Sequence, residues 1–199
     1  MSSRRQEHTE ETRRALLGAA RTLFGTRGYG ATSLDDVAQA ARVTKGALYH
    51  HHEGKRQLFE AVVEELEAEV VARVVAAAAG GATAWDRALR GLEASLDACL
   101  DPVYRRIVLQ DAPVVLGPDR WRELEGRYSL GLMRATLDAL MADGTLRPRP
   151  PELLARVLLA AELQAAQAIA ESPDPPAARR QAGELLRDLL SGLRAGNPA

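Results

Sequence analysis

The apolar residues of this chain recur at helical rather than alternating intervals, and this periodicity constrains the fold most. Leu58, Val62, Leu66 and Val70 follow one another every four residues, which places them on one face of an α-helix. The apolar residues are mainly Ala, Leu and Val, and long alternating runs rich in Val, Ile and Thr do not occur. The sequence therefore predicts an all-α protein.

Glycine and proline divide the chain into helical segments and suggest two domains. We expect an N-terminal helix-turn-helix domain over residues 1–53, a linking helix that starts there and ends before Gly80-Gly81, and a helical second domain over 80–199. The helices are predicted at 9–25, 32–41, 44–52, 54–79, 83–100, 102–111, 118–143, 150–171 and 175–195.

Two short helices joined by a brief turn lie within residues 32–52. Thr32 and Ser33 offer hydroxyls that can cap the first helix, and Thr44 can cap the second. Residues 1–60 carry ten Lys and Arg against seven Asp and Glu, whereas the remaining residues carry sixteen against twenty. A helix-turn-helix at the cationic end of a chain is typical of DNA binding, with the second helix in the major groove.

The same region resembles the DNA-binding domain of TetR-family transcriptional regulators over about residues 9–62. The resemblance implies an N-terminal three-helix head and a C-terminal helical domain that binds a ligand and dimerises. It is carried by Phe24, Gly28-Tyr29, Thr32-Ser33-Leu34, Val37-Ala38, Ala41, Val43-Thr44-Lys45-Gly46-Ala47-Leu48-Tyr49, His51, Lys55 and Leu58-Phe59.

The resemblance implies a role in DNA binding for ten residues. Phosphate contacts are expected for Ser33, Lys45, Tyr49, His51 and Lys55, and base contacts for Thr44, Ala47 and His50. Gly46 would permit close approach of the helix backbone, and Ala47 either does the same or contacts a thymine methyl group. Arg42 stands where the family most often has glycine, so either the turn differs or Arg42 adds a DNA contact that offsets backbone strain.

Three adjacent histidines, His50, His51 and His52, first suggest a metal site. Successive helical side chains point about 100° apart, so these three cannot converge on one ion. We expect no metal and no cofactor. His52 replaces the family's usual buried phenylalanine and is expected to be packed, and Gly54 replaces the commoner capping hydroxyl before Lys55.

The resemblance also assigns roles to the second domain. A small, partly apolar effector is expected in a pocket, and the last two helices are expected to pair with those of a second subunit; burial within one subunit is the alternative for those leucines. The expected pocket residues are Trp85, Leu89, Leu96, Tyr104, Gln110, Trp121, Tyr128, Met133, Gln164 and Gln167, and the expected dimer residues are Leu154, Leu158, Ala161, Leu186, Leu189, Leu190 and Leu193.

The implied function is a ligand-responsive regulator, most simply a repressor, that binds a near-palindromic operator as a homodimer and is released by its effector. The alternative is a helical ligand-binding dimer whose DNA-binding head is degenerate. No nucleophile, base and oxyanion site can be assembled from the sequence, so an enzyme is not expected. The sequence contains a single cysteine, and we expect no apolar segment of the roughly 18 residues needed to span a membrane. Both features predict a cytoplasmic protein without membrane contact.

Overall fold

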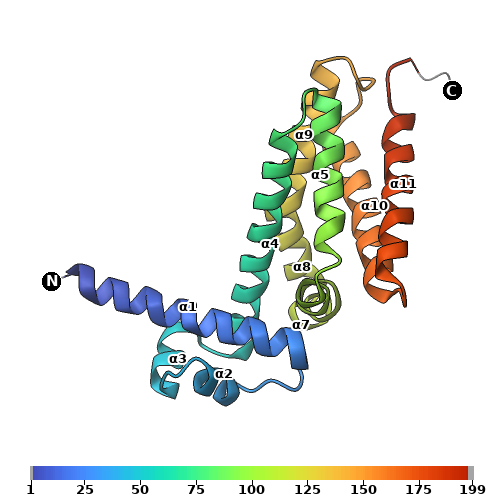
Figure 1. Ribbon diagram of the computed structural model, residues 1–199. Helices are drawn as coiled ribbons and strands as arrows, with labels where there is room; N and C mark the ends of the chain where they lie inside the picture. The colour runs from blue at the N-terminus through green and yellow to red at the C-terminus, as the bar shows by residue number, and fades with distance from the viewer. Residues whose placement is uncertain (1, 197–199) are drawn as a thin grey trace. The chain divides into compact units, whose positions relative to one another are not determined.

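The computed structural model describes residues 2–196, apart from the side chains of residues 2–5, 7, 8 and 125. Over these residues the chain is helical and contains no β-strand, only an isolated antiparallel bridge between Leu146 and Arg194. The expected all-α fold is thereby confirmed. The chain forms two compact units: residues up to Leu66 with Pro102–Pro118, and Glu67–Asp101 with the residues from Asp119 onward (Figure 1).

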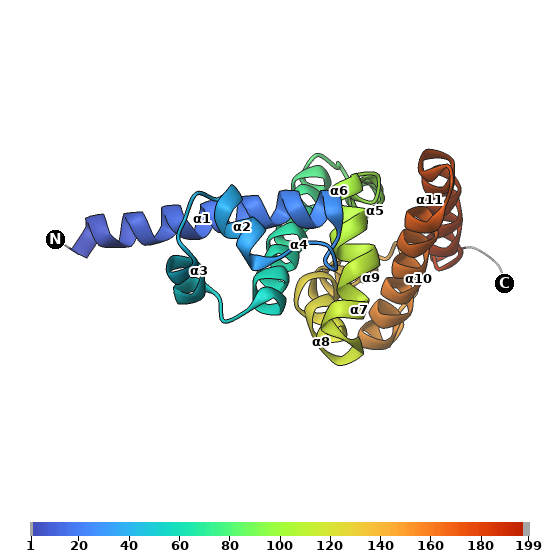
Figure 2. The same ribbon diagram turned by 90° about the horizontal axis from the view of Figure 1, so that it is seen from below.

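The first unit is built on α1 (Ser2–Arg27), α2 (Leu34–Ala40), α3 (Lys45–His51) and the start of α4 (Lys55–Ala79). The expected helices are present, and α1 is longer at both ends than predicted. Helix α1 lies across α2 and α3 in both views (Figures 1 and 2). Its apolar face and theirs bury a core of Leu16, Leu17, Ala20, Phe24, Val37, Ala38, Leu48, Leu58, Phe59 and Val62.

The segment Pro102–Pro118 completes the first unit, although the sequence placed it in the second domain. It consists of α6 (Pro102–Tyr104), the π-helix η1 (Arg105–Asp111) and α7 (Ala112–Leu116). The sequence predicted a helix over 102–111 but not its π-helical form, nor α7. Its α6 and η1 parts pack against α1. The buried residues of the segment are Tyr104, Ile107, Val108, Leu109, Ala112 and Leu116.

The second unit contains the rest of α4 and six further helical elements. These are α5 (Ala84–Ala98), α8 (Pro118–Glu125) with the π-helix η2 (Gly126–Leu130), α9 (Gly131–Ala142), α10 (Pro151–Glu171) and α11 (Pro175–Gly192). The single helix expected over 118–143 is thus interrupted by a π-helical turn. Ala84, Ala88, Leu137, Leu140, Leu146 and Ala155 form one of its buried clusters.

Helix α10 corrects one expectation drawn from the sequence. By length and composition it is apolar enough to cross a membrane, whereas no such segment was expected. Its inner face, with Ala155, Leu159 and Ile169, is buried against neighbouring helices, and α11 lies beside it in both views (Figures 1 and 2). The apolar character of α10 is therefore explained in part by packing within its own unit.

Candidate nucleic-acid interface

Helix α2 begins with a reciprocal cap. The backbone N–H of Asp36 donates to Ser33 Oγ at 3.1 Å, and the backbone N–H of Ser33 donates to Asp36 Oδ2 at 3.0 Å. The Ser33 hydroxyl also donates to Asp36 Oδ2 at 2.6 Å, and these hydrogen bonds lower the pKa of the Asp36 carboxyl. Both Ser33 donors expected to hold a phosphate are therefore engaged by Asp36, which a phosphate would have to displace.

The turn between α2 and α3 contains a left-handed arginine. Arg42 has φ 57°, and the next amide, that of Val43, donates to the Ala38 carbonyl at 3.0 Å. The turn thus keeps the backbone shape for which glycine is suited, at a strain of about 1–2 kcal/mol for an L-residue. Of the two explanations left open by the sequence, a changed turn is contradicted. The Arg42 side chain is exposed.

Helix α3 presents a polar face outward. Thr44 caps it, accepting from the Ala47 N–H at 3.2 Å, and Leu48 fixes its inner face in the core. Lys45, Gly46, Tyr49 and His50 are exposed with Thr44, while Ala47 and His51 are half-buried.

Gly46 is not required by packing inside the protein. A Cβ built on it would have Thr44 Oγ1, at 3.9 Å, as its nearest neighbour. Packing within the protein therefore does not explain why this residue is glycine.

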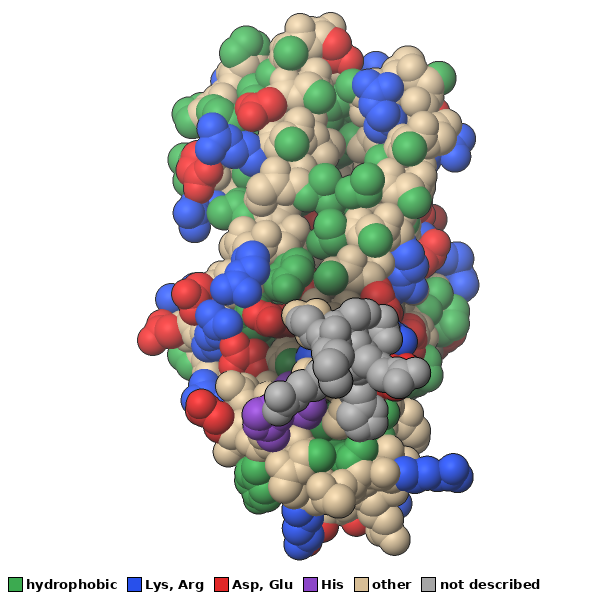
Figure 3. Space-filling view, turned by 90° about the vertical axis from the view of Figure 1, so that its left-hand side faces the viewer, with side chains coloured by type: hydrophobic (Ala, Val, Ile, Leu, Met, Phe, Trp, Pro, Cys, Tyr) green, Lys and Arg blue, Asp and Glu red, His purple; other side chains and the backbone are tan. Residues whose placement is uncertain are grey.

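The three histidines have different environments. The His50 and His51 rings lie edge to face with centroids 5.6 Å apart, and the histidine side chains visible in Figure 3 form one patch. His52 ends α3 with only 7% of its surface exposed, and its Nε2 atom has no hydrogen-bond partner. Burial lowers the pKa of His52, and nearby His51 and Arg13 lower it further. His52 is packed, as expected.

The only two lysines of the chain are held in different ways. Lys45 Nζ lies 2.7 Å from Asp35 Oδ2 on α2, and this bond raises the pKa of Lys45. Lys55 Nζ lies 4.2 Å from the centroid of the Tyr29 ring and 3.4 Å from the Gly30 carbonyl oxygen. A phosphate would have to displace the Asp35 carboxylate from Lys45, whereas Lys55 lies against an aromatic ring and a carbonyl oxygen, neither of which carries a full negative charge.

Tyr29 is a functional candidate that sequence reasoning left without a role. Its ring lies 5.0 Å from Phe59 and 5.9 Å from Phe24 between centroids, so it is fixed by the core beneath Lys55. Asp35 was also missed, because pairing with Lys45 requires the geometry of α2 against α3. Helical spacing alone carries no information on either contact.

The residues expected to line an effector pocket belong to both units and differ in their exposure. Tyr104 and Gln110 belong to the first unit and the other eight to the second. Leu96 is fully buried, Gln164 is exposed, and Gln167 donates to Glu171 at 2.7 Å. Trp85 and Met133 pack on the core cluster of the second unit, and Leu89 lines a groove. Tyr104 is buried, Trp121 and Tyr128 are half-buried, and Gln110 is exposed.

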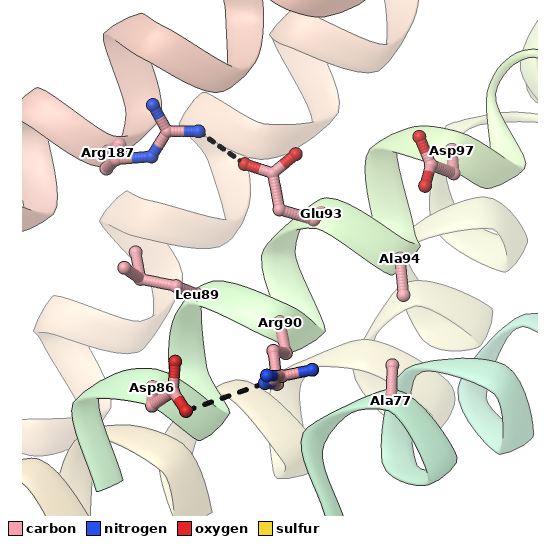
Figure 4. Close-up of a pocket in the computed structure, with 8 residues that line it drawn as sticks. All are labelled: Ala77, Asp86, Leu89, Arg90, Glu93, Ala94, Asp97 and Arg187. Atoms are coloured by element: carbon pink, nitrogen blue, oxygen red, sulfur yellow. Dashed lines mark hydrogen bonds and ion pairs between the residues drawn. The ribbon is translucent and has the colours of Figure 1, made fainter. Parts of the chain in front are cut away.

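This groove, of about 530 Å³, lies among α4, α5 and α11 (Figure 4). Its carboxylates are matched by arginines. Glu93 pairs with Arg187 at 2.6 Å, and Asp86 pairs with Arg90 at 3.5 Å. Arg179 pairs with both Glu93 and Asp97, so the groove offers a ligand little uncompensated charge.

Buried Cys99 and half-buried Glu162 are titratable groups of the second unit whose pKa is raised. Burial, with the charges of Glu162 and Glu67, raises the pKa of the Cys99 thiol to about 12. Burial also raises the pKa of Glu162 on α10, which a hydrogen bond with Ser95 opposes. Cys99 is therefore a buried, protonated residue at neutral pH.

The expected dimer residues face mostly inward. Leu186 is buried in its own subunit, and Leu154, Leu158, Leu190 and Leu193 pack partly buried on the core cluster of the second unit; Ala161 is half-buried. Leu189 alone of the seven is exposed. The large apolar side chains that are exposed on α10 and α11 are Leu153, Val157, Leu185 and Leu189.

Comparison with known proteins agrees with this architecture. Residues 16–62 match the family model for bacterial regulatory proteins of the tetR family, and residues 85–193 match that for a tetracyclin repressor-like C-terminal domain. A solved TetR-family transcriptional regulator from Pectobacterium atrosepticum is 35% identical, with a TM-score of 0.84 over 97% of this chain and 98% of that chain.

Two curated relatives differ in how much of the chain they match. The Transposon Tn10 TetC protein of Escherichia coli is 29% identical over 156 residues, 77% of each protein. The HTH-type transcriptional regulator AcrR of Shigella flexneri is 37% identical over 70 residues, 35% of this chain and 33% of AcrR. Both units of this chain thus have their counterparts among regulators of one kind, and the chain belongs to the TetR family of transcriptional regulators.

Proposed function

We propose that this protein is a repressor that binds a near-palindromic operator as a homodimer in the cytoplasm and is released by a small-molecule effector. One observation carries the DNA-binding part: a capped recognition helix, α3, is anchored by Leu48 and exposes Thr44, Lys45, Gly46, Tyr49 and His50. We assign base contacts to Thr44, Ala47 and His50, and phosphate contacts to Lys45, Tyr49, His51 and Lys55.

Arg42 joins this surface in the proposal. Arg42 adopts a strained left-handed conformation that glycine would adopt without strain. The Arg42 side chain is exposed, three residues before the start of α3. A contact with a phosphate or base would offset the strain. Ser33 is a weaker candidate, since Asp36 already takes both of its donors.

The dimer is supported by the exposed apolar face of α10 and α11. Leu153, Val157, Leu185 and Leu189 are each more than half exposed, which is costly for a stripe of large apolar side chains in water. A second copy that covers this face would place two recognition helices on one duplex, with half-sites about one turn apart. We therefore assign the interface to these four residues.

The effector is proposed to bind in the second unit, which matches a tetracyclin repressor-like C-terminal domain. Release requires only that the effector bind the DNA-free form more tightly, and a coupling of about 1–3 kcal/mol would change operator affinity between severalfold and about a hundredfold. No residue is assigned a catalytic role, and the chemistry of the effector is left open.

Selection of bound duplexes from a random pool tests this function. A repressor of this kind enriches a palindromic consensus, and substitution of Thr44 or His50 with alanine changes the base preference at one position of each half-site. Enrichment of no sequence, with only salt-sensitive binding of all duplexes, would instead favour a ligand-binding dimer with a degenerate head.

A further inference from the structure

A carboxylate outside the helix-turn-helix contacts the loop that supports Lys55. Asp111, the last residue of the π-helix η1, accepts a hydrogen bond from the Tyr29 backbone N–H at 2.8 Å. Its Oδ2 atom also lies 3.4 Å from Arg106 Nε, and the Asp111 side chain is only 17% exposed. A partly buried, charge-assisted hydrogen bond between residues 82 positions apart therefore fixes the backbone of the α1–α2 loop.

The same loop determines where the Lys55 ammonium lies. The Tyr29 ring lies beneath Lys55 Nζ, and the next residue, Gly30, offers its carbonyl oxygen to the same atom. The hydrogen bond from Asp111 is made to the backbone of Tyr29 itself. Displacement of this backbone would move both groups that hold Lys55.

Two further contacts show how closely the Pro102–Pro118 segment fits this part of the head. Gly28 has φ 81°, and a Cβ on it would lie 2.2 Å from Arg106 Nη2, so the Arg106 side chain occupies space that only glycine leaves free. Arg56, next to Lys55 on α4, donates to the Leu116 carbonyl at 2.8 Å. The segment thus contacts both Arg56, the next residue after Lys55, and the α1–α2 loop that supports Lys55.

We propose that Asp111 is a positioning residue for DNA binding, acting through Tyr29 to hold the Lys55 ammonium for a phosphate. The inference rests on the proposed DNA-binding function and adds to it a residue beyond the 16–62 match to the DNA-binding family model. Asp111 itself carries a negative charge and does not touch the DNA.

Whether removal of the Asp111 carboxylate weakens or strengthens DNA binding distinguishes a positioning role from a purely electrostatic effect. Loss of a carboxylate from a DNA-binding protein makes its field more favourable to phosphates and strengthens binding. A positioning role predicts the opposite for Asp111. Asp119 provides the matched control, because its carboxylate is exposed and pairs with Arg122, one turn along α8.

The experiment measures the affinity of the full-length protein for a non-specific duplex over a range of salt concentrations. Asp111→Asn is expected to weaken binding about threefold and Asp111→Ala about tenfold, since a neutral acceptor makes a weaker bond than a charged one and alanine makes none. Asp119→Asn should leave affinity unchanged or raise it slightly. Loss of one phosphate contact should also make the slope of log K against log salt shallower by about 0.9.

A double-mutant cycle with Lys55→Ala tests the route of the effect. If Asp111 acts through Lys55, Asp111→Asn causes no further loss in the Lys55→Ala background and leaves its salt slope unchanged. Equal losses in both backgrounds, or unchanged binding by the Asp111 variants, would overturn the proposal. Circular dichroism at the assay temperature verifies folding, and Asp111→Asn, which keeps the side-chain shape, decides the matter should Asp111→Ala unfold.

The outcome is separable from that of the proposed function. A protein that selects no palindrome but loses salt-dependent duplex affinity on Asp111→Asn would refute the repressor and retain the positioning role. A protein that selects a palindrome and is insensitive to Asp111→Asn would do the reverse.

Discussion

Replacing the buried His52 with leucine should stabilise the protein and reduce its sensitivity to acid. The side chain is 7% exposed and its Nε2 atom lacks a partner, so the folded state bears a desolvation penalty of about 1–3 kcal/mol. Leucine is similar in volume and carries no polar atom, and repacking reduces the gain by less than about 1.5 kcal/mol. We expect the free energy of unfolding of His52→Leu at pH 8 to rise by about 1 kcal/mol.

The pH dependence follows from the lowered pKa of His52. Because burial lowers this pKa in the folded state, the unfolded chain binds a proton more readily as pH falls below about 6.5. The contribution of neutral His52 to stability is therefore complete above that pH and is lost as pH falls toward the folded-state pKa. Urea unfolding at pH 8, 6.5 and 5 should show a smaller acid loss for His52→Leu than for the wild type.

His50→Leu is the matched control, since the exposed His50 ring is free of this penalty. It should leave the pH dependence of unfolding as it is in the wild type. The reasoning is refuted if His52→Leu loses stability in acid as steeply as the wild type, or if it is less stable than the wild type at pH 8.

Two other substitutions test features of the proposed interfaces. Arg42→Gly removes a left-handed backbone strain of about 1–2 kcal/mol but increases the entropy of the unfolded chain, at a cost of about 0.4–1 kcal/mol. Urea unfolding should therefore show slight stabilisation, and titration with the selected operator should show weaker binding. A variant less stable than the wild type would contradict the assignment of backbone strain to Arg42. Leu189→Glu should be monomeric by light scattering and should bind the operator more weakly. The control, Val114→Glu, changes an exposed apolar residue of the first unit and should remain dimeric. A dimeric Leu189→Glu variant would contradict the proposed interface.

The helices of the head could be predicted because their ends are encoded locally. Ser33 and Thr44 carry the hydroxyls that cap α2 and α3, and a cap requires only neighbouring residues. Helix α4 ends at Ala79, directly before Gly80-Gly81, and the low helix propensity of glycine is likewise a local signal. The π-helices η1 and η2 have no comparable signal, since the residues that form an i→i+5 turn also suit an α-helix.

The outward face of α11 could not be predicted because leucines occupy both sides of the helix. Leu185 and Leu186 are adjacent, as are Leu189 and Leu190. Helical spacing therefore places Leu185 with Leu189 on one stripe and Leu186 with Leu190 on another, and either stripe could face the core. The structure buries Leu186 and exposes Leu185. Only the position of the neighbouring helices decides between them, and the same is true of the contact between Asp111 and Tyr29.

The inclusion of Pro102–Pro118 in the first unit affects how regulators of this kind can be recombined. A chimaera cut at residue 62, where the match to the DNA-binding family model ends, would place Tyr29 and Gly28 against a foreign segment in place of Asp111 and Arg106. Such a hybrid would inherit a recognition helix without the support that fits it. The transplantable module is discontinuous in sequence, and exchange of DNA specificity between relatives should carry both pieces together.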